Sequence, residues 1–257
     1  MEVVILCGGL GTRMREETEF RPKPMVPIGQ HPVLWHVMKY YASFGHTRFV
    51  LALGYKGEVI KDYFVNYDMM NSDLTLRLGD RGNMVAHAQH GESEWVVTLA
   101  DTGVDSLKGS RLKRVERYVT GDTFCMTYGD GVCDVDLDAL IAFHHAHGRV
   151  GTVTGVNPTS QFGEMRMDGH AVRAFYEKPT SPTALVNGGY MVFNRRIFDY
   201  VTRDQSCDLE VGALEQLARE GQLMAFAHAG NWACMDTLRD RERLNRVWAD
   251  RPFWKRW

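Results

Sequence analysis

Hydrophobic positions in the first 156 residues alternate between short continuous runs and runs at helical spacing. The continuous runs are rich in β-branched residues and end at glycine or polar turns, which predicts buried strands. The predicted strands are Glu2–Cys7, Arg48–Leu53, Trp95–Ala100, Thr123–Tyr128 and Val150–Val156. Helical patterns lie between them, after Pro32, over residues 59–64, and after predicted caps at Ser110 and Asp136. This alternation predicts a Rossmann-like, mostly parallel α/β sheet with helices on both faces.

The second half of the chain has a more mixed pattern. Residues 164–167 and 171–176 flank Asp168-Gly169, a dipeptide typical of tight hairpin turns, and predict a small β-rich insertion that contacts the substrate. The other predicted elements are strands Asn187–Phe193 and Leu223–His228 and helices Leu209–Glu220 and Arg239–Trp248. Because neither an internal repeat nor a linker is evident, residues 1–257 are predicted to form a single domain.

The composition is that of an ordinary folded protein. Of 257 residues, 44% are hydrophobic and 24% are charged, and the formal net charge is −2. These values exclude disorder and a generally basic nucleic-acid-binding surface. No apolar run is long enough for a membrane span, and Val3–Cys7 is too short for a signal sequence. The five cysteines form no C-x-x-C pair, which favours reduced thiols in a cytoplasmic protein.

The first candidate site is a glycine-rich loop after the first predicted strand, Gly8-Gly9-Leu10-Gly11-Thr12-Arg13. Ligands of open α/β sheets bind at the carboxyl ends of strands, where glycines let backbone N–H groups face an anion. Arg13 adds a guanidinium suited to phosphate oxygens. The loop is neither a Walker A motif nor a dinucleotide fingerprint, because no Gly-Lys-Ser/Thr follows and Met14 replaces the last glycine. A plain tight turn with a surface arginine is the alternative.

Two further positions suggest charged chemistry. Lys23 lies between Pro22 and Pro24, which restrict the backbone around it, and a fixed ammonium is what a catalytic cation requires. The alternative for Lys23 is a solvated loop lysine. Asp130 follows the Thr123–Tyr128 strand between two glycines, where it is either a metal ligand or a turn aspartate.

Several motifs, in this order along the chain, resemble the signature of the sugar-1-phosphate nucleotidyltransferases. After the glycine-rich loop and Pro22-Lys23-Pro24-Met25 come Thr127-Tyr128-Gly129-Asp130-Gly131, Glu177-Lys178-Pro179, Asn187-Gly188-Gly189-Tyr190 and Trp232-Ala233-Cys234-Met235-Asp236-Thr237. Residues 54–57 with 63–64, and residues 101–103 with 109–115, are most similar to the family members that use CTP and glucose 1-phosphate. The resemblance covers almost the whole chain.

The resemblance implies an enzyme that joins a sugar 1-phosphate to a nucleoside triphosphate and releases pyrophosphate. The sugar phosphate oxygen would attack the α-phosphorus in line, so that positioning and charge neutralisation carry the catalysis. The implied catalytic residues are Arg13 at the leaving pyrophosphate, Lys23 at the α-phosphate and the incoming phosphate, and Asp130. Asp130 and Asp236 would hold Mg²⁺, which takes few protein carboxylates and keeps positions for water and phosphate.

The same resemblance implies two sets of binding residues. The nucleotide set is Leu6, Cys7, Gly8, Gly9, Leu10, Gly11, Thr12, Arg13, Lys23, Thr102, Gly103, Arg111, Tyr128 and Gly129. The sugar-phosphate set is Glu177, Lys178, Asn187, Gly188 and Gly189. The chain departs from the family pattern at Gly188, where alanine is expected, and at Glu164, where a small or apolar residue is expected. Both departures bear on which sugar fits.

CTP and glucose 1-phosphate are therefore the expected substrates, with CDP-glucose and pyrophosphate as products. Use of dTTP, UTP or another sugar 1-phosphate is the neighbouring alternative, because no single residue decides the base. A regulator that binds nucleotide sugars without turnover is an alternative of another class, although it would be marked by loss of Arg13, Lys23 or an aspartate. The resemblance also suggests a homo-oligomer such as a hexamer, and no nucleic acid or membrane is expected as a partner.

Two remaining features have less specific interpretations. His144, His145 and His147 end a predicted helix, and an exposed helix face is expected there rather than a metal site. The aromatic tail Phe253–Trp257 is either a frayed terminus or a contact between subunits.

Overall fold

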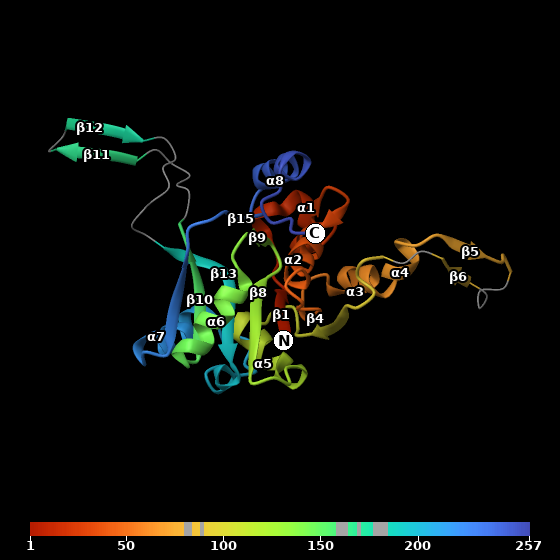
Figure 1. Cartoon of the computed structure of the whole chain (residues 1–257), viewed down its shortest axis with the longest axis horizontal. Coiled ribbons are helices and arrows are strands. Elements are labelled where there is room, and N and C mark those ends of the chain that lie inside the picture. The colour runs from red at the N-terminus through yellow and green to blue at the C-terminus, as the bar shows by residue number, and fades with distance from the viewer. Residues whose placement is uncertain (80–83, 88–89, 158–163, 169–170, 177–184) are drawn as a thin grey trace.

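A seven-stranded sheet lies at the centre of the chain (Figure 1), in a computed structural model that describes residues 1–79, 84–87, 90–157, 164–168, 171–176 and 185–257. The strand order is β14-β10-β13-β8-β1-β4-β7. The strands are β1 (Glu2–Cys7), β4 (Arg48–Leu53), β7 (Val96–Asp101), β8 (Thr123–Tyr128), β10 (Gly151–Val156), β13 (Val186–Asn194) and β14 (Leu223–His228). β13 pairs antiparallel with β8 and β10, and the other pairs are parallel. The prediction of a mostly parallel α/β sheet is confirmed.

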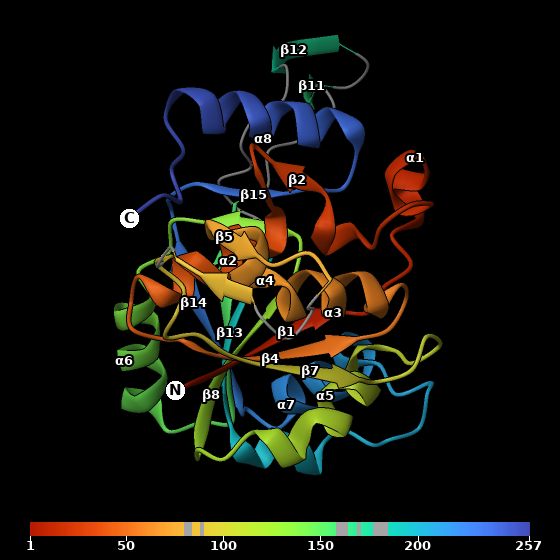
Figure 2. The ribbon, with the colours of Figure 1, turned by 90° about the vertical axis from the view of Figure 1, so that its right-hand side faces the viewer.

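Helices cover both faces of this sheet (Figure 2). Along β1, Val3, Ile5 and Cys7 belong to one hydrophobic core and Val4 and Leu6 to the other, because successive side chains of a strand point to opposite faces. The first core includes residues of α2 (Val33–Ala42), α3 (Gly57–Val65), α6 (Leu137–His147) and α8 (Leu238–Asp250). The second includes residues of α5 (Lys108–Val115), the 3₁₀ helix η4 (Arg195–Asp199), the π-helical turn η5 (Leu209–Leu214) and α7 (Glu215–Arg219).

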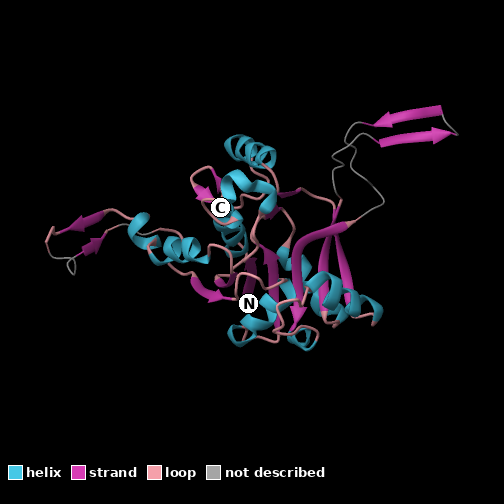
Figure 3. Ribbon diagram, turned by 180° about the vertical axis from the view of Figure 1, so that it is seen from behind, coloured by secondary structure: helices cyan, strands magenta, loops and turns pink. Residues whose placement is uncertain are grey.

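Small antiparallel pairs lie outside the main sheet. They are β2 (Pro27–Ile28) with β3 (His31–Pro32), β5 (Leu74–Leu76) with β6 (Met84–Ala86), β9 (Gly131–Cys133) with β15 (Trp232–Cys234), and β11 (Glu164–Asp168) with β12 (Ala171–Tyr176). The β5–β6 and β11–β12 pairs project from opposite sides of the molecule (Figures 1 and 3). The predicted hairpin at residues 164–176 is therefore confirmed as a strand pair, whereas the β5–β6 pair was not predicted.

Five further short helices lie in the connecting segments of the described chain. They are η1 (Thr12–Met14), α1 (Arg15–Thr18), η2 (Lys23–Met25), α4 (Tyr67–Met70) and η3 (Glu116–Tyr118). The predicted cap at Asp136 is confirmed, because its carboxylate accepts a hydrogen bond from the Ala139 N–H at 3.1 Å. The predicted cap at Ser110 is wrong. α5 begins two residues earlier, at Lys108, and Ser110 is buried inside the helix. Its hydroxyl donates a hydrogen bond to the Arg203 carbonyl at 3.2 Å.

The expectation of an exposed histidine face at the end of α6 is wrong for two of its residues. His144 is only 3% exposed, and its Nδ1 lies 2.8 Å from Thr152 Oγ1 on β10. His147 Nε2 lies 2.8 Å from the same hydroxyl. Burial, followed by the neighbouring histidines, lowers the pKa of His144 to about 4. The two side chains thus attach α6 to the sheet.

The aromatic side chains of the tail pack against the rest of this chain, whereas Lys255 and Arg256 between them are exposed. Trp254 is fully buried, its ring lies 6.0 Å from that of Trp248, and its indole N–H faces His36 Nδ1 at 3.3 Å. Trp257 lies edge-on to Trp35 at 5.7 Å. The tail therefore completes the core that α2 and α8 share. Among the described residues, none of the helices combines the length and apolar character that crossing a membrane requires.

Candidate active site

The β9–β15 pair brings together two aspartates that are far apart in the sequence. Asp130 directly precedes β9, and Asp236 follows β15 by two residues. Gly131 pairs with Cys234, and the Met235 N–H donates to the Asp130 carbonyl at 2.9 Å. As a result, one carboxylate oxygen of each aspartate and Cys234 Sγ all lie within 4.8 Å of one another. The structure places both predicted metal ligands at one point.

Lys23 lies between these carboxylates. It is the first residue of η2, directly after Pro22, and it is only 8% exposed. Its Nζ lies 2.7 Å from Asp130 Oδ2 and also donates a hydrogen bond to Asp236 Oδ1. Burial alone would lower the pKa of Lys23, but the charge of Asp130 and hydrogen bonds to both aspartates raise it. The ammonium is therefore held charged at the centre of the site.

Arg13 reaches the same cluster from the glycine-rich loop. Its guanidinium lies 2.7 Å from Asp236 Oδ2, although the Arg13 side chain is 71% exposed. Burial would raise the pKa of Asp236, but the hydrogen bond and charge of Lys23, together with Arg13, lower it. Two carboxylates and two cations thus form a charge-balanced group at the mouth of the site.

The glycines of the loop have different structural requirements. A Cβ on Gly8 would lie 2.1 Å from the Arg111 guanidinium, and Gly11 has a φ of +64° with Thr18 in the way of a side chain. Gly9, in contrast, is exposed and faces open space. Gly129 packs against Pro24 and Cys7, which joins the ends of β8 and β1 to η2. The backbone at Gly9 is free to approach a ligand.

Arg111 connects the ends of three neighbouring strands. It is 4% exposed, and its guanidinium donates to the carbonyl oxygens of Gly8, Gly103, Val104 and Leu53 at 2.7–3.1 Å and to Thr102 Oγ1 at 2.8 Å. These bonds fix the loop after β1 against the segment after β7. The structure therefore places Arg111, Thr102 and Gly103 beside the glycine-rich loop, with the guanidinium occupied by protein oxygens.

On the other side of the aspartates, Asn187, Gly188 and Gly189 form the start of β13. Gly189 has a φ of +85°, and a Cβ there would lie 2.7 Å from the Tyr128 ring. A Cβ on Gly188 would lie 2.7 Å from Val156 Cγ1, which explains why glycine stands where the family pattern has alanine. Trp232 Nε1 donates to the Gly188 carbonyl at 2.7 Å. Glu177 and Lys178 lie outside the described residues, so their predicted roles stay predictions.

Two residues near the site were not singled out from the sequence. Cys234 lies beside the aspartates, and burial, followed by the charge of Asp130, raises the pKa of its thiol. Glu210, on η5, accepts hydrogen bonds from Tyr128 Oη at 2.5 Å and from Lys108 Nζ. Its Oε2 is buried and finds no partner among the described residues. A π-helical turn has no sequence periodicity that would have revealed Glu210, whereas Cys234 stood within a recognised motif.

The donor set fits a hard divalent cation. Asp130 and Asp236 supply carboxylate oxygens, whereas the Cys234 thiol is kept protonated and does not compete with them. The side chains of the two aspartates are 22% and 26% exposed, which leaves them accessible to phosphate and water. In the free chain their charge is balanced by Lys23 and Arg13.

A family model described as nucleotidyl transferase matches residues 2–250. The chain therefore belongs to the nucleotidyl transferase family, and the resemblance noted from the motifs is confirmed. Members of this family generally use a divalent metal ion and act on nucleoside triphosphates and sugar 1-phosphates.

Within the family, the chain is similar to the glucose-1-phosphate cytidylyltransferases of Salmonella typhi and Salmonella typhimurium. Each is 46% identical, and the alignments cover 100% of this chain and of each relative. A solved structure of UDP-glucose pyrophosphorylase complexed with UDP-glucose is 14% identical, with a TM-score of 0.68 over 96% of this chain and 98% of that one. The last comparison supports the fold alone.

Proposed function

We propose that the chain transfers a cytidylyl group from CTP to α-D-glucose 1-phosphate, giving CDP-glucose and pyrophosphate. The observation that carries this proposal is the convergence of Asp130, Asp236 and Lys23 beside the glycine-rich loop that ends in Arg13. The choice of CTP and glucose 1-phosphate is supported by relatives of that name that are 46% identical over the full length.

The charges of the free site suggest how substrates are received. Lys23 and Arg13 are paired with aspartates, so an incoming triphosphate would draw both cations toward its oxygens. The exposed backbone at Gly9 would face the phosphates, Arg13 would stabilise the departing pyrophosphate, and Lys23 would neutralise the α-phosphate and the attacking phosphate. Asp130 and Asp236 would then hold Mg²⁺, which supplies positive charge to both phosphoryl groups.

The sugar would occupy the side of the aspartates formed by Asn187, Gly188 and Gly189. Asn187 Oδ1 accepts from the Gly189 N–H at 2.9 Å, which orients the side chain, and its Nδ2 lies 3.4 Å from Tyr128 Oη. Because both glycines are closely packed on their Cβ sides, the backbone is the surface that a sugar ring would meet. This arrangement supports the predicted sugar-phosphate role of these residues.

Pyrophosphate release from the purified protein with CTP, glucose 1-phosphate and Mg²⁺ tests the proposal. A matrix with dTTP, UTP and other sugar 1-phosphates tests the base and the sugar, and we expect the highest kcat/KM for CTP with glucose 1-phosphate. Higher kcat/KM for another pair would replace the substrates and keep the reaction. Binding of nucleotide sugar without pyrophosphate from any pair would favour the regulator instead.

We further propose a cytoplasmic location, one domain over residues 1–257, and a homo-oligomer such as a hexamer. The location is supported by the five free cysteines. The single domain is supported by the family model, which spans residues 2–250. The oligomer is supported by apolar side chains on the projecting pairs, including Leu76, Met84 and Val172, which are 55%, 42% and 51% exposed. Light scattering after size-exclusion chromatography measures the subunit number.

A further inference from the structure

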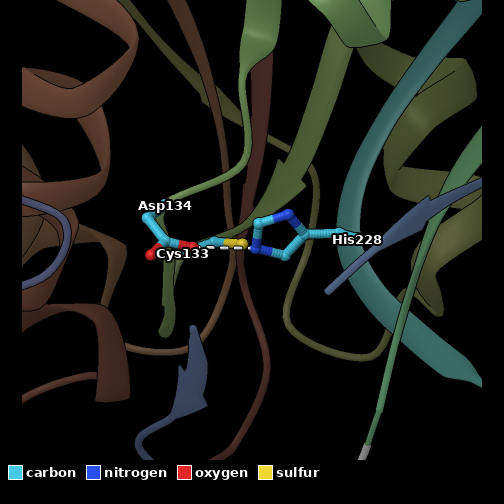
Figure 4. Close-up of side chains that lie close together, drawn as sticks. All are labelled: Cys133, Asp134 and His228. Atoms are coloured by element: carbon cyan, nitrogen blue, oxygen red, sulfur yellow. Dashed lines mark hydrogen bonds and ion pairs between the residues drawn. The ribbon is translucent and has the colours of Figure 1, made fainter. Parts of the chain in front are cut away.

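A second group of side chains of the types that ligate metals lies at the other end of the β9–β15 pair. Cys133 ends β9, Asp134 follows it, and His228 ends β14 (Figure 4). One ligand atom of each residue, a sulfur, an oxygen and a nitrogen, lies within 4.8 Å of the other two. Cys133 pairs with Trp232, whereas the Asp130 and Asp236 end of the same ladder is formed by Gly131 and Cys234. The group is thus separate from the candidate active site.

Neighbouring residues pack closely against the Asp134 carboxylate and the His228 imidazole. His228 Nε2 lies 2.8 Å from Asp134 Oδ1, and the Asn231 backbone N–H donates to the same oxygen at 2.7 Å. The Asn231 side-chain amide donates to Asp134 Oδ2, also at 2.7 Å. A Cβ on Gly230 would lie 2.4 Å from Asp134 Oδ1 and 2.8 Å from His228 Nε2. The turn between β14 and β15 can therefore bring the histidine to the carboxylate only because residue 230 has no side chain.

The chemistry of the three donors differs from that of the catalytic carboxylates. Thiolate, imidazole and carboxylate together suit Zn²⁺ and similar borderline cations, whereas Mg²⁺ prefers oxygen alone. Tetrahedral Zn²⁺ with such ligands requires donor separations of roughly 3.3–3.7 Å. To reach these separations, the 2.8 Å His228–Asp134 contact would have to open slightly and the Cys133 sulfur would have to move closer to it. The Asn231 side-chain amide would keep its hydrogen bond to Asp134 Oδ2 and so orient the carboxylate.

Burial makes the Cys133 thiolate costly to form, so only a cation that bonds strongly to sulfur would be held through it. Cys133 is fully buried, and the His228 side chain is only 10% exposed. Burial raises the pKa of the Cys133 thiol to about 12, so the free thiol stays protonated at neutral pH. Binding must release that proton to solvent, which a thiophilic cation achieves by forming the metal–sulfur bond. No oxidation or reduction is involved.

We propose that Cys133, Asp134 and His228 form a binding site for one thiophilic divalent cation of the Zn²⁺ class, with water as the fourth ligand. The cation would join the end of β14 to the outer end of the β9–β15 pair, whose inner end carries Asp130 and Asp236. Because it would bind the folded chain and not the unfolded one, it would raise the unfolding temperature.

The test uses Co²⁺ as the probe on the full chain after chelator treatment and dialysis. Excess Mg²⁺ is kept present to fill the catalytic carboxylates. We expect one equivalent of Co²⁺ to produce a near-ultraviolet thiolate-to-cobalt absorption band. The Cys133→Ser variant should lose this band. The matched control is Cys234→Ser, which removes the thiol beside the catalytic aspartates and should keep the band.

The proposal is overturned if the parent protein shows no thiolate band, or if Cys234→Ser loses it while Cys133→Ser retains it. If Cys133→Ser does not fold, X-ray absorption of the Zn²⁺-loaded parent decides the question. The absorption spectrum is expected to show one sulfur and one imidazole among the ligands of Zn²⁺. A coordination shell made only of oxygen atoms would refute the site. None of these measurements depends on turnover, so they stand apart from the proposed function.

Discussion

Replacing Lys23 with methionine should have opposite effects on metal binding and on catalysis. In the free chain the Lys23 ammonium contacts both aspartates that would hold the divalent cation. The ammonium and the cation therefore compete for the same carboxylate oxygens before nucleotide binds. We expect Lys23→Met to bind Mg²⁺ or Mn²⁺ more tightly without nucleotide, and to have a much lower kcat with both substrates.

The expected change in cation affinity follows from the distance between the two carboxylates. Their facing oxygens are no more than 4.8 Å apart. At an effective dielectric constant of about 20, two like charges at this separation repel by roughly 3 kcal/mol. Lys23 offsets this repulsion in the parent, and in the variant a divalent cation would relieve it. If only half of this repulsion energy contributes to binding, the affinity for the cation rises about tenfold, since each factor of ten corresponds to about 1.4 kcal/mol. Loss of the charge opposite the α-phosphate should lower kcat by roughly 10²–10³-fold.

Calorimetric titration with Mg²⁺, or Mn²⁺ binding followed by electron paramagnetic resonance, measures the first effect. Steady-state pyrophosphate release measures the second. Arg13→Met is the matched control, because its ion pair with Asp236 involves a side chain that is 71% exposed and contributes at most about 1 kcal/mol. Its cation affinity should change by less than about fivefold. Unchanged or weaker cation binding in Lys23→Met would show that lysine and metal do not share these oxygens.

Three further outcomes are expected. Asp130→Asn should lower kcat by about 10³-fold, or roughly 4 kcal/mol, because one charged metal ligand is lost; activity near the parent level at ordinary Mg²⁺ would exclude Asp130 as a ligand. Burial lowers the pKa of His36 to about 4, below an unfolded value near 6.5, so His36 alone should reduce stability by about 3 kcal/mol between pH 6.5 and 4. Urea unfolding should show a shallower pH dependence for His36→Gln. Trp254→Ala should cost about 3–5 kcal/mol in the same assay, because Trp254 is fully buried, and Trp254→Phe should cost less.

The main sheet could be predicted because most of its inner strands are buried on both faces. Such strands have continuous apolar runs, as in β1, where alternate residues enter two different cores. The helices between them follow the usual spacing, and Asp136 caps α6 as its position predicts. His144 was misjudged because its partner, Thr152, lies on a strand that no local pattern relates to the helix face. The tail was undecided for the same reason, since His36 and Trp248 are distant in sequence.

The candidate site was predicted only as a set of residues. The family resemblance put Lys23, Asp130 and Asp236 together, and the structure brings them into contact. That one lysine contacts both carboxylates could not be predicted, because it depends on β9 and β15. Each of these strands has three residues, which is too short for any hydrophobic period to be visible. The π-helical turn that carries Glu210 was likewise expected to be ordinary helix.

The dependence of the aspartates on such a short ladder has a mechanical consequence. Two strands of three residues each are only marginally stable by their own hydrogen bonds, so the ladder that positions the carboxylates needs support from neighbouring elements. Tyr190 Oη donates to the Gly131 carbonyl at 3.1 Å, and Trp232 Nε1 donates to the Gly188 carbonyl at 2.7 Å. Both supports come from β13 or act on it, and β13 also presents the residues that would meet the sugar. If the sugar binds against Gly188 as proposed, a change in its fit would be transmitted through Trp232 to the ladder that carries the two aspartates, and choice of sugar would then affect catalysis as well as binding.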